Sequence, residues 1–203
     1  PMLLLELAKI SPPTEAFNLC NTILSFPSLQ QSILTDTLSL HNTLIPHISD
    51  NFIFYPKDTI NTILTRKINT LPNITFTITT CKRYDLFEKT INSFLNCCTD
   101  IHLIDHWLCV DDNSSQEDRT KMKENYPFFE FYFKTIQEKG HANSMNIIKN
   151  KISTPYVFHM EDDWKFFSKQ NYISLCLNIL TQSPELCQCL INKNYSETHT
   201  DNI

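Results

Sequence analysis

The spacing of hydrophobic and polar positions changes at Pro72. Before it, apolar side chains recur every three or four residues, which is the spacing of one buried helix face. Three helices are expected there: one between Ser11 and Pro27, one over 29–45 that Pro46 stops, and one over 59–68. We therefore predict a small helical N-terminal extension over residues 1–71, which either caps the main domain or forms a helix-hairpin unit.

After Pro72, short β-branched or apolar runs alternate with amphipathic segments. The expected strands cover 74–80, 105–110, 128–133 and 156–160, and a further strand is expected over 186–191. The expected helices cover 86–95, a polar stretch through Lys121, a segment that begins at Gly140, and 172–180. Repeated strand–helix units of this kind predict an α/β domain over 72–203, with a mostly parallel sheet and helices on both faces.

Composition and charge exclude several classes of protein. The net charge is −5 and no run of Lys or Arg occurs, so nucleic acid is not expected as a partner. The apolar run Met2–Leu5 is too short for a signal peptide or a membrane span. The eight cysteines include no CxxC pair, which favours reduced thiols and a cytoplasmic protein. Frequent Asn, Ile, Thr and Lys are typical of AT-rich genomes such as those of large DNA viruses, which would mean the host cytoplasm.

Gly140 is the only glycine in 203 residues. Average glycine usage is about 7%, so a backbone that needs positive φ has only one residue here that adopts it without cost. We therefore expect Gly140 to occupy a position that the backbone requires.

Two of the expected strands run directly into acidic residues. Asp111 and Asp112 follow the second strand, and Glu161, Asp162 and Asp163 follow the fourth. Ligands of open α/β sheets bind outside the carboxyl ends of the strands, and carboxylate oxygens suit Mg²⁺ or Mn²⁺. The two clusters together predict a metal-assisted phosphate site. The alternative is that each cluster is a solvated turn whose Asp and Asn side chains cap the next helix.

Five motifs in this order resemble the nucleotide-sugar-binding half of GT-A glycosyltransferases, notably the family 2 type. They are Ile-Thr-Thr-Cys-Lys-Arg at 78–83, Thr-Ile-Asn-Ser-Phe at 90–94, Val-Asp-Asp-Asn-Ser-Ser at 110–115, Lys-Gly-His-Ala-Asn-Ser-Met-Asn at 139–146, and His-Met-Glu-Asp-Asp-Trp at 159–164. The resemblance extends from Asn73 to about Asn194. It implies a GT-A, Rossmann-like fold.

The resemblance also implies residue roles in binding the donor. Thr79 is similar to a residue that contacts uridine, and Asp112, next to Asp111, is similar to the carboxylate that accepts the uracil N–H. Cys81 is a departure from the family, which often has an aromatic side chain that stacks on the base at this position. Asp162 is similar to the residue near the ribose and the donor sugar.

The metal would be held by the last acid of a DxD-like motif, which is Glu-Asp-Asp here. Asp163 is similar to the ligand itself, and Glu161 is expected to orient its neighbours. A bound Mn²⁺ or Mg²⁺ would stabilise the charge of a diphosphate leaving group.

Other donor contacts follow from the residues alone. Arg83 or Lys82 is placed to contact the diphosphate, although a solvated loop charge is the alternative. The helix that begins at Gly140 offers free N–H groups, with His141 and Asn143 in its first turn. For His141 a cap or surface role is the alternative.

The function expected from these features is a metal-dependent glycosyltransferase donor domain that uses a UDP-sugar and transfers it to a glycan or protein acceptor. The catalytic base is expected beyond Ile203, where the acceptor half of the family begins, so the chain alone would be a fragment. One alternative is a non-catalytic nucleotide-sugar-binding or assembly module. Another is a sugar nucleotidyltransferase, which would need a Gly-rich loop after the first strand, and no glycine precedes Gly140.

Overall fold

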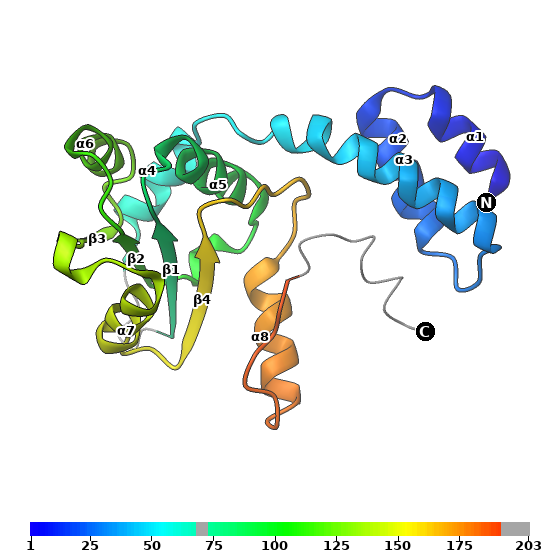
Figure 1. Cartoon of the computed structure of the whole chain (residues 1–203). Coiled ribbons are helices and arrows are strands. Elements are labelled where there is room, and N and C mark those ends of the chain that lie inside the picture. Colours follow the sequence, from blue (N-terminus) through cyan, green and yellow to red (C-terminus); the bar gives the residue numbers. More distant parts are fainter. Residues whose placement is uncertain (68–72, 192–203) are drawn as a thin grey trace. The chain divides into compact units, whose positions relative to one another are not determined.

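The computed structural model describes residues 1–67 and 73–191 (Figure 1). Its contacts divide the chain into two compact units, one that includes Pro1–Phe52 and one formed by Ile53–Cys189. The domain boundary predicted after Leu71, and the end of the family resemblance near Asn194, lie outside the described residues. The segment from Ile53 to Thr65, which the sequence pattern groups with the N-terminal extension, belongs to the second unit by its contacts.

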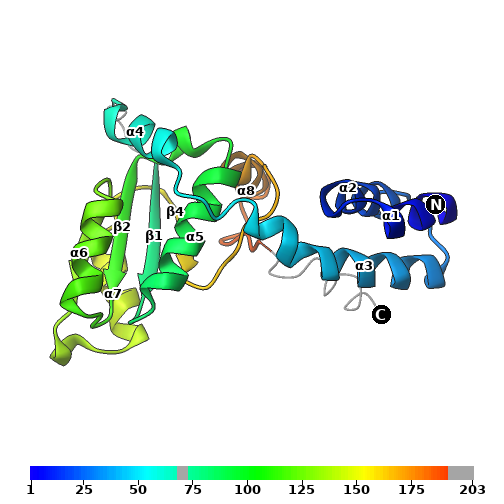
Figure 2. The same ribbon diagram turned by 90° about the horizontal axis from the view of Figure 1, so that it is seen from above.

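The first unit is helical, as predicted, with helices α1 (Met2–Ile10), α2 (Pro13–Leu24) and α3 (Gln31–Asp50) (Figures 1 and 2). Helix α2 begins at the expected prolines. Its buried face carries Phe17, which stacks on the ring of His41 in α3 with 4.6 Å between ring centroids. Helix α1 was not predicted, because its apolar residues form one short run rather than a spaced pattern.

The prediction that Pro46 ends the second helix is wrong, because α3 continues through Pro46 to Asp50. Proline in a helix removes one backbone hydrogen bond and crowds the preceding turn. However, Leu44 and Ile48 are both buried on the same face, one on each side of the proline. Burial of this face outweighs the local cost, since tertiary packing supplies most of the stability of a helix within a folded protein.

The second unit contains a four-stranded, fully parallel sheet in the order β3-β2-β1-β4. Its strands are β1 (Ile74–Thr80), β2 (His106–Asp111), β3 (Glu130–Phe133) and β4 (Tyr156–Glu161). The ends of each strand lie within two residues of the predicted range. Strand β1 is buried along its whole length, as a strand between two neighbours in a covered sheet should be. The predicted α/β, Rossmann-like fold is confirmed.

The register brings the acidic strand ends together. Thr80 at the end of β1 pairs with Asp111 of β2, and Thr79 pairs with Glu161 of β4. Figure 1 shows β1 between β2 and β4 with all three arrows pointing the same way. The two acidic clusters therefore lie at the carboxyl ends of the strands, on either side of β1.

The helices of this unit are α4 (Lys57–Thr65), α5 (Tyr84–Cys97), α6 (Gln116–Asn125), α7 (His141–Lys151) and α8 (Tyr172–Gln182). Helices α5 and α7 pack on opposite faces of the sheet. On one face, Phe94 of α5 packs on Phe76 and Trp107 at centroid distances of 5.1 and 6.4 Å. On the other, Ile148 of α7 packs on Leu108 and Val110.

One predicted strand does not form. Residues 186–191 have no regular structure, and Leu186 and Leu190 are 44% and 76% exposed. An apolar run becomes a strand only where a partner edge is available to pair with its backbone. Within the described part of the chain, no strand pairs with this segment.

Candidate functional site

A cleft of about 250 Å³ lies at the carboxyl ends of β1 and β4. All but two of the residues that line it are ones that the sequence assigned to donor binding. The lining residues are Thr79, Thr80, Cys81, Arg83, Asp112, His141, Ser144, Glu161 and Asp162. The two that sequence reasoning missed are Thr80 and Ser144, which carry hydroxyl groups and gave no signal of their own.

A larger hollow of about 490 Å³ lies at the opposite ends of the strands, near Thr75 and His106. Its charged groups are already paired within the protein: Arg66 with Asp105 at 3.0 Å, and Lys151 with Glu130 at 2.6 Å. Ligands of open α/β sheets bind at the carboxyl ends of the strands. The smaller cleft is therefore the candidate site.

Asp162 is fully buried at the base of the cleft, and its carboxylate points back into the protein. It accepts hydrogen bonds from Thr80 Oγ1 at 2.7 Å and Cys81 N at 3.4 Å, and it forms an ion pair with Arg83. The Arg83 side chain is 46% exposed, and its second nitrogen lies 3.9 Å from Asp163. Asp162 therefore anchors the guanidinium group of Arg83 beside the cleft.

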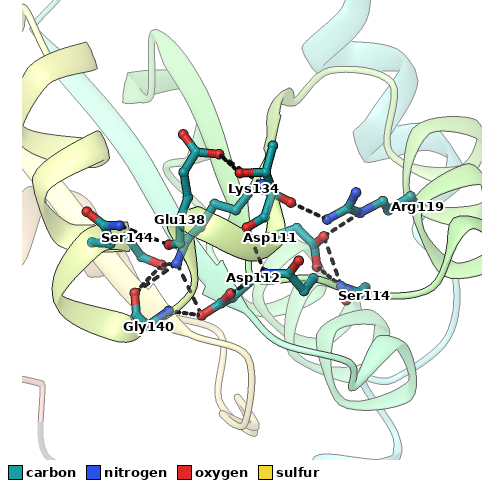
Figure 3. A network of polar contacts seen from close by, with 11 residues as sticks. Asp111, Asp112, Ser114, Arg119, Lys134, Glu138, Gly140 and Ser144 are labelled. Atoms are coloured by element: carbon teal, nitrogen blue, oxygen red, sulfur yellow. Dashed lines mark hydrogen bonds and ion pairs between the residues drawn. The ribbon is translucent and has the colours of Figure 1, made fainter.

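The two acids that follow β2 have different surroundings (Figure 3). Asp111 is fully buried, accepts from Arg119 Nε at 2.7 Å and Ser114 N at 3.2 Å, and does not line the cleft. Asp112 does line the cleft. The first acid thus fixes the loop after β2, and the second is available to a ligand.

Three donors hold the Asp112 carboxylate. Its Oδ2 accepts from Gly140 N at 2.8 Å and lies 3.1 Å from Lys134 Nζ, and its Oδ1 accepts from Asn113 Nδ2 at 2.8 Å. Burial alone would raise the pKa of Asp112, but the bonds from Asn113, Gly140 and Lys134 outweigh it, and the pKa lies below its ordinary value. Asp112 is therefore an ionised acceptor at neutral pH.

Gly140 is the N-cap of α7 and has φ 113° and ψ 146°, a conformation that essentially only glycine adopts. The expectation that the backbone requires glycine here is confirmed. Its N–H bonds Asp112 while the first turn of α7 places His141 and Ser144 against the cleft. Asn143 instead donates to Glu138 O at 3.1 Å and is exposed outside the cleft lining.

Two other residues near the cleft have positive φ without being glycine. Lys82, after β1, has φ 56°, and Asn113, after β2, has φ 66°. The backbone N–H of Lys82 donates to Ser114 Oγ at 2.9 Å, which ties the two loops together. Lys82 does not line the cleft, so Arg83 is the cation that the structure places there.

The acids after β4 fit a divalent cation in part. Within residues 1–67 and 73–191, no group of three His, Cys, Asp or Glu side chains could hold a metal by itself. Glu161 is exposed and lines the cleft, whereas Asp163, whose side chain is 35% exposed, lies outside the cleft lining; both carboxylates are accessible to solvent. Mg²⁺ is commonly held by one or two carboxylates together with substrate phosphates and water. The donor set therefore suits a metal that arrives with a diphosphate.

Comparison with protein-family models gives no match, and comparison with curated proteins gives none either. The resemblance to glycosyltransferases consequently rests on the motifs and on the site. Among the described residues, no helix combines the length and the apolar character that crossing a membrane requires.

Proposed function

We propose that the chain is the donor-binding domain of a metal-dependent glycosyltransferase, whose cleft receives a nucleotide diphosphate sugar. One observation carries the proposal. The cleft brings together an ionised acceptor, Asp112, a half-exposed cation, Arg83, and the N-terminal turn of α7, from three separate parts of the chain. These three features suit a nucleoside diphosphate, because one can accept a hydrogen bond from the base and the other two attract phosphate.

Asp112 is the residue that recognises the base. An ionised carboxylate only accepts hydrogen bonds, so it selects a base that presents an N–H, as uracil does. Thr79, at the end of β1 and 9% exposed, lines the same cleft and contacts the nucleoside in this proposal. The donor is therefore a UDP-sugar.

Arg83 binds the diphosphate. Its guanidinium forms an ion pair with the buried Asp162 and is almost half exposed, so it keeps N–H groups free for phosphate oxygens. Asp162 in this proposal does not bind metal, because its side chain is fully buried, unlike that of Asp112, and Thr80, Cys81 and Arg83 occupy its oxygens. It fixes the direction of Arg83.

Asp163 and Glu161 would hold Mn²⁺ or Mg²⁺. When bound, such a cation neutralises charge that develops on the departing diphosphate. Arg83 and the N–H groups of α7 supply the same kind of stabilisation from the protein itself. The sugar would pass to a glycan or protein acceptor.

A specific observation favours a second candidate, a nucleotide-sugar-binding module that needs no metal. Three of the acids at the strand ends have a close basic partner within the protein: Asp111 has Arg119, Asp112 has Lys134, and Asp162 has Arg83. These three carboxylates are neutralised without any added cation. Asp163 lies farther from Arg83, at 3.9 Å. The two candidates differ in whether ligand affinity depends on metal.

The two candidates can be distinguished by calorimetry of UDP binding, measured once in the presence of Mn²⁺ and once in the presence of EDTA. The transferase proposal expects weak binding in EDTA and clearly tighter binding with Mn²⁺, and Asp163→Ala should abolish the difference. Glu124→Ala, which removes an exposed carboxylate on α6, is the matched control and should leave the difference in UDP affinity between the two buffers unchanged. Equal affinity in both buffers would support the metal-free module. If UDP does not bind in either buffer, the assignment of the cleft as a nucleotide-sugar site is wrong.

A further inference from the structure

We propose that Lys134, which does not itself line the cleft, is a positioning residue for base recognition: it holds the Asp112 carboxylate and the first turn of α7 in the arrangement that the nucleoside meets. The identity of the ligand in this inference rests on the proposed function. The contacts of Lys134 do not depend on the proposed function, because they are present in the protein without any ligand.

Lys134 follows β3 directly, and its side chain is completely buried. Its ammonium donates to Gly140 O at 2.8 Å and Ser144 Oγ at 3.0 Å, and lies 3.1 Å from Asp112 Oδ2 (Figure 3). A lysine ammonium has three N–H groups, so each has one oxygen partner. Every one of these oxygens belongs to a residue of the cleft wall or to the N-cap of α7.

A buried lysine at this position is not explained by stability alone. Lysine is almost never fully buried unless it is paired, and desolvation of a buried ion pair can exceed the attraction between its charges. The N-terminus of a helix also carries partial positive charge, which disfavours an ammonium beside it. Apolar side chains in place of both members of the Lys134–Asp112 pair would fill the same space without these costs.

The contacts show what the lysine does instead. Asp112 Oδ2 is shared by Lys134 and the Gly140 N–H, while Lys134 also bonds the carbonyl of Gly140. The ammonium thus joins the carboxylate to both polar groups of the N-cap. This fixes the Asp112 rotamer and directs its remaining acceptor capacity toward the cleft, where the side chain is 12% exposed.

The test compares uridine, UDP and inorganic pyrophosphate as ligands of Lys134→Met, with Lys151→Met as the control. Lys151 also forms an ion pair, but with Glu130, outside the cleft lining. Lys134→Met should weaken uridine and UDP binding by about tenfold to a hundredfold, as expected when a buried polar partner is lost. Pyrophosphate with Mn²⁺ should bind within about twofold of wild type. A loss that is equal for all three ligands, or no loss for uridine, overturns the proposal.

A double variant shows whether the lysine acts through Asp112. In an Asp112→Asn background, Lys134→Met should change uridine affinity by less than about twofold, because coupled residues are not additive. If Lys134→Met weakens uridine binding in that background as much as it does in the wild type, Lys134 does not act through Asp112. If Lys134→Met does not fold, Lys134→Gln, whose amide can still donate to Asp112, takes its place. If neither single variant nor the double variant folds, the role of Lys134 is structural and the proposal is wrong.

Hydrogen exchange of the ligand-free protein keeps this inference separate from the proposed function. The Gly140 N–H, which bonds Asp112, should exchange at least about tenfold faster in Lys134→Met than in wild type or Lys151→Met. If wild type binds no uridine but this acceleration is seen, the ligand assignment fails and the positioning role stands. An unchanged exchange rate at Gly140 overturns the positioning role.

Discussion

Asp162 and Asp163 are neighbours with the same side chain, yet the structure predicts very different costs for replacing them with alanine. Asp162 is fully buried and accepts hydrogen bonds from Thr80 Oγ1, Cys81 N and Arg83. Asp163 is 35% exposed, and its carboxylate lies 3.9 Å from the Arg83 guanidinium. Removing Asp162 therefore leaves the buried Thr80 hydroxyl without its acceptor, whereas removing Asp163 affects only groups that water can reach.

The magnitude for Asp162→Ala follows from its partners. Breaking a fully buried ion pair costs about 3–5 kcal/mol, but Arg83 is almost half exposed and water recovers much of its share. The Thr80 hydroxyl is buried, and an unsatisfied buried donor costs about 1–3 kcal/mol. We expect a loss of about 2–3 kcal/mol for Asp162→Ala, or roughly 8 °C in the melting temperature of the sheet unit. For Asp163→Ala we expect at most about 0.5 kcal/mol.

Urea unfolding of both variants at pH 7 measures these losses. Asp162→Asn is a graded control, because its amide oxygen still accepts from Thr80 while its charge is gone, and it should fall between wild type and Asp162→Ala. Equal losses for Asp162→Ala and Asp163→Ala would show that Asp162 is not buried in this network. The assignment of Asp162 as the anchor of Arg83 would then be refuted.

Two further substitutions test other parts of the second unit. Gly140→Ala should lower the stability of the second unit by about 1–3 kcal/mol in thermal unfolding. The cost is backbone strain at φ 113°, because an added Cβ would have no neighbour within 4 Å. An unchanged stability would refute the positive φ at Gly140. Burial would raise the pKa of Asp100, but bonds from Ser174, Cys98 and Ile173 outweigh it and lower the pKa. A carboxyl with a lowered folded pKa contributes stability above its unfolded pKa of about 3.9 and loses it as pH falls. Between pH 5 and pH 3, wild type should therefore lose more stability in urea unfolding than Asp100→Asn, and equal losses would contradict this.

The sheet could be predicted from the sequence because its signals are local. Each strand is a short apolar or β-branched run, and the residues of β1 and β4 that follow or end these runs are polar. The errors arose where distant contacts override local signals. Pro46 does not stop α3 because Leu44 and Ile48 are buried around it, and 186–191 lacks a partner edge.

The acids of the candidate site and Arg83 were predicted from the sequence, but the pairing of each acid with a basic residue was not. Acids at strand ends are visible in the sequence, since they directly follow apolar runs. Their partners come from elsewhere: Arg83 pairs with a residue 79 positions away, and Lys134 follows a different strand from Asp112. A lysine immediately after an apolar strand was the one available signal for Lys134. The sequence could not show whether such a lysine points to solvent or into the protein.

The unusual backbone of the loops around the cleft limits which residues evolution can place there. Lys82 and Asn113 have φ of 56° and 66°, in a region where side chains branched at Cβ are strongly disfavoured. In a chain with a single glycine, both positions are held by residues that tolerate this conformation only at some cost. Homologous chains that keep this cleft should therefore vary at 82 and 113 mainly toward Asn, Asp and Gly, and avoid the Ile and Thr that are common elsewhere in the sequence.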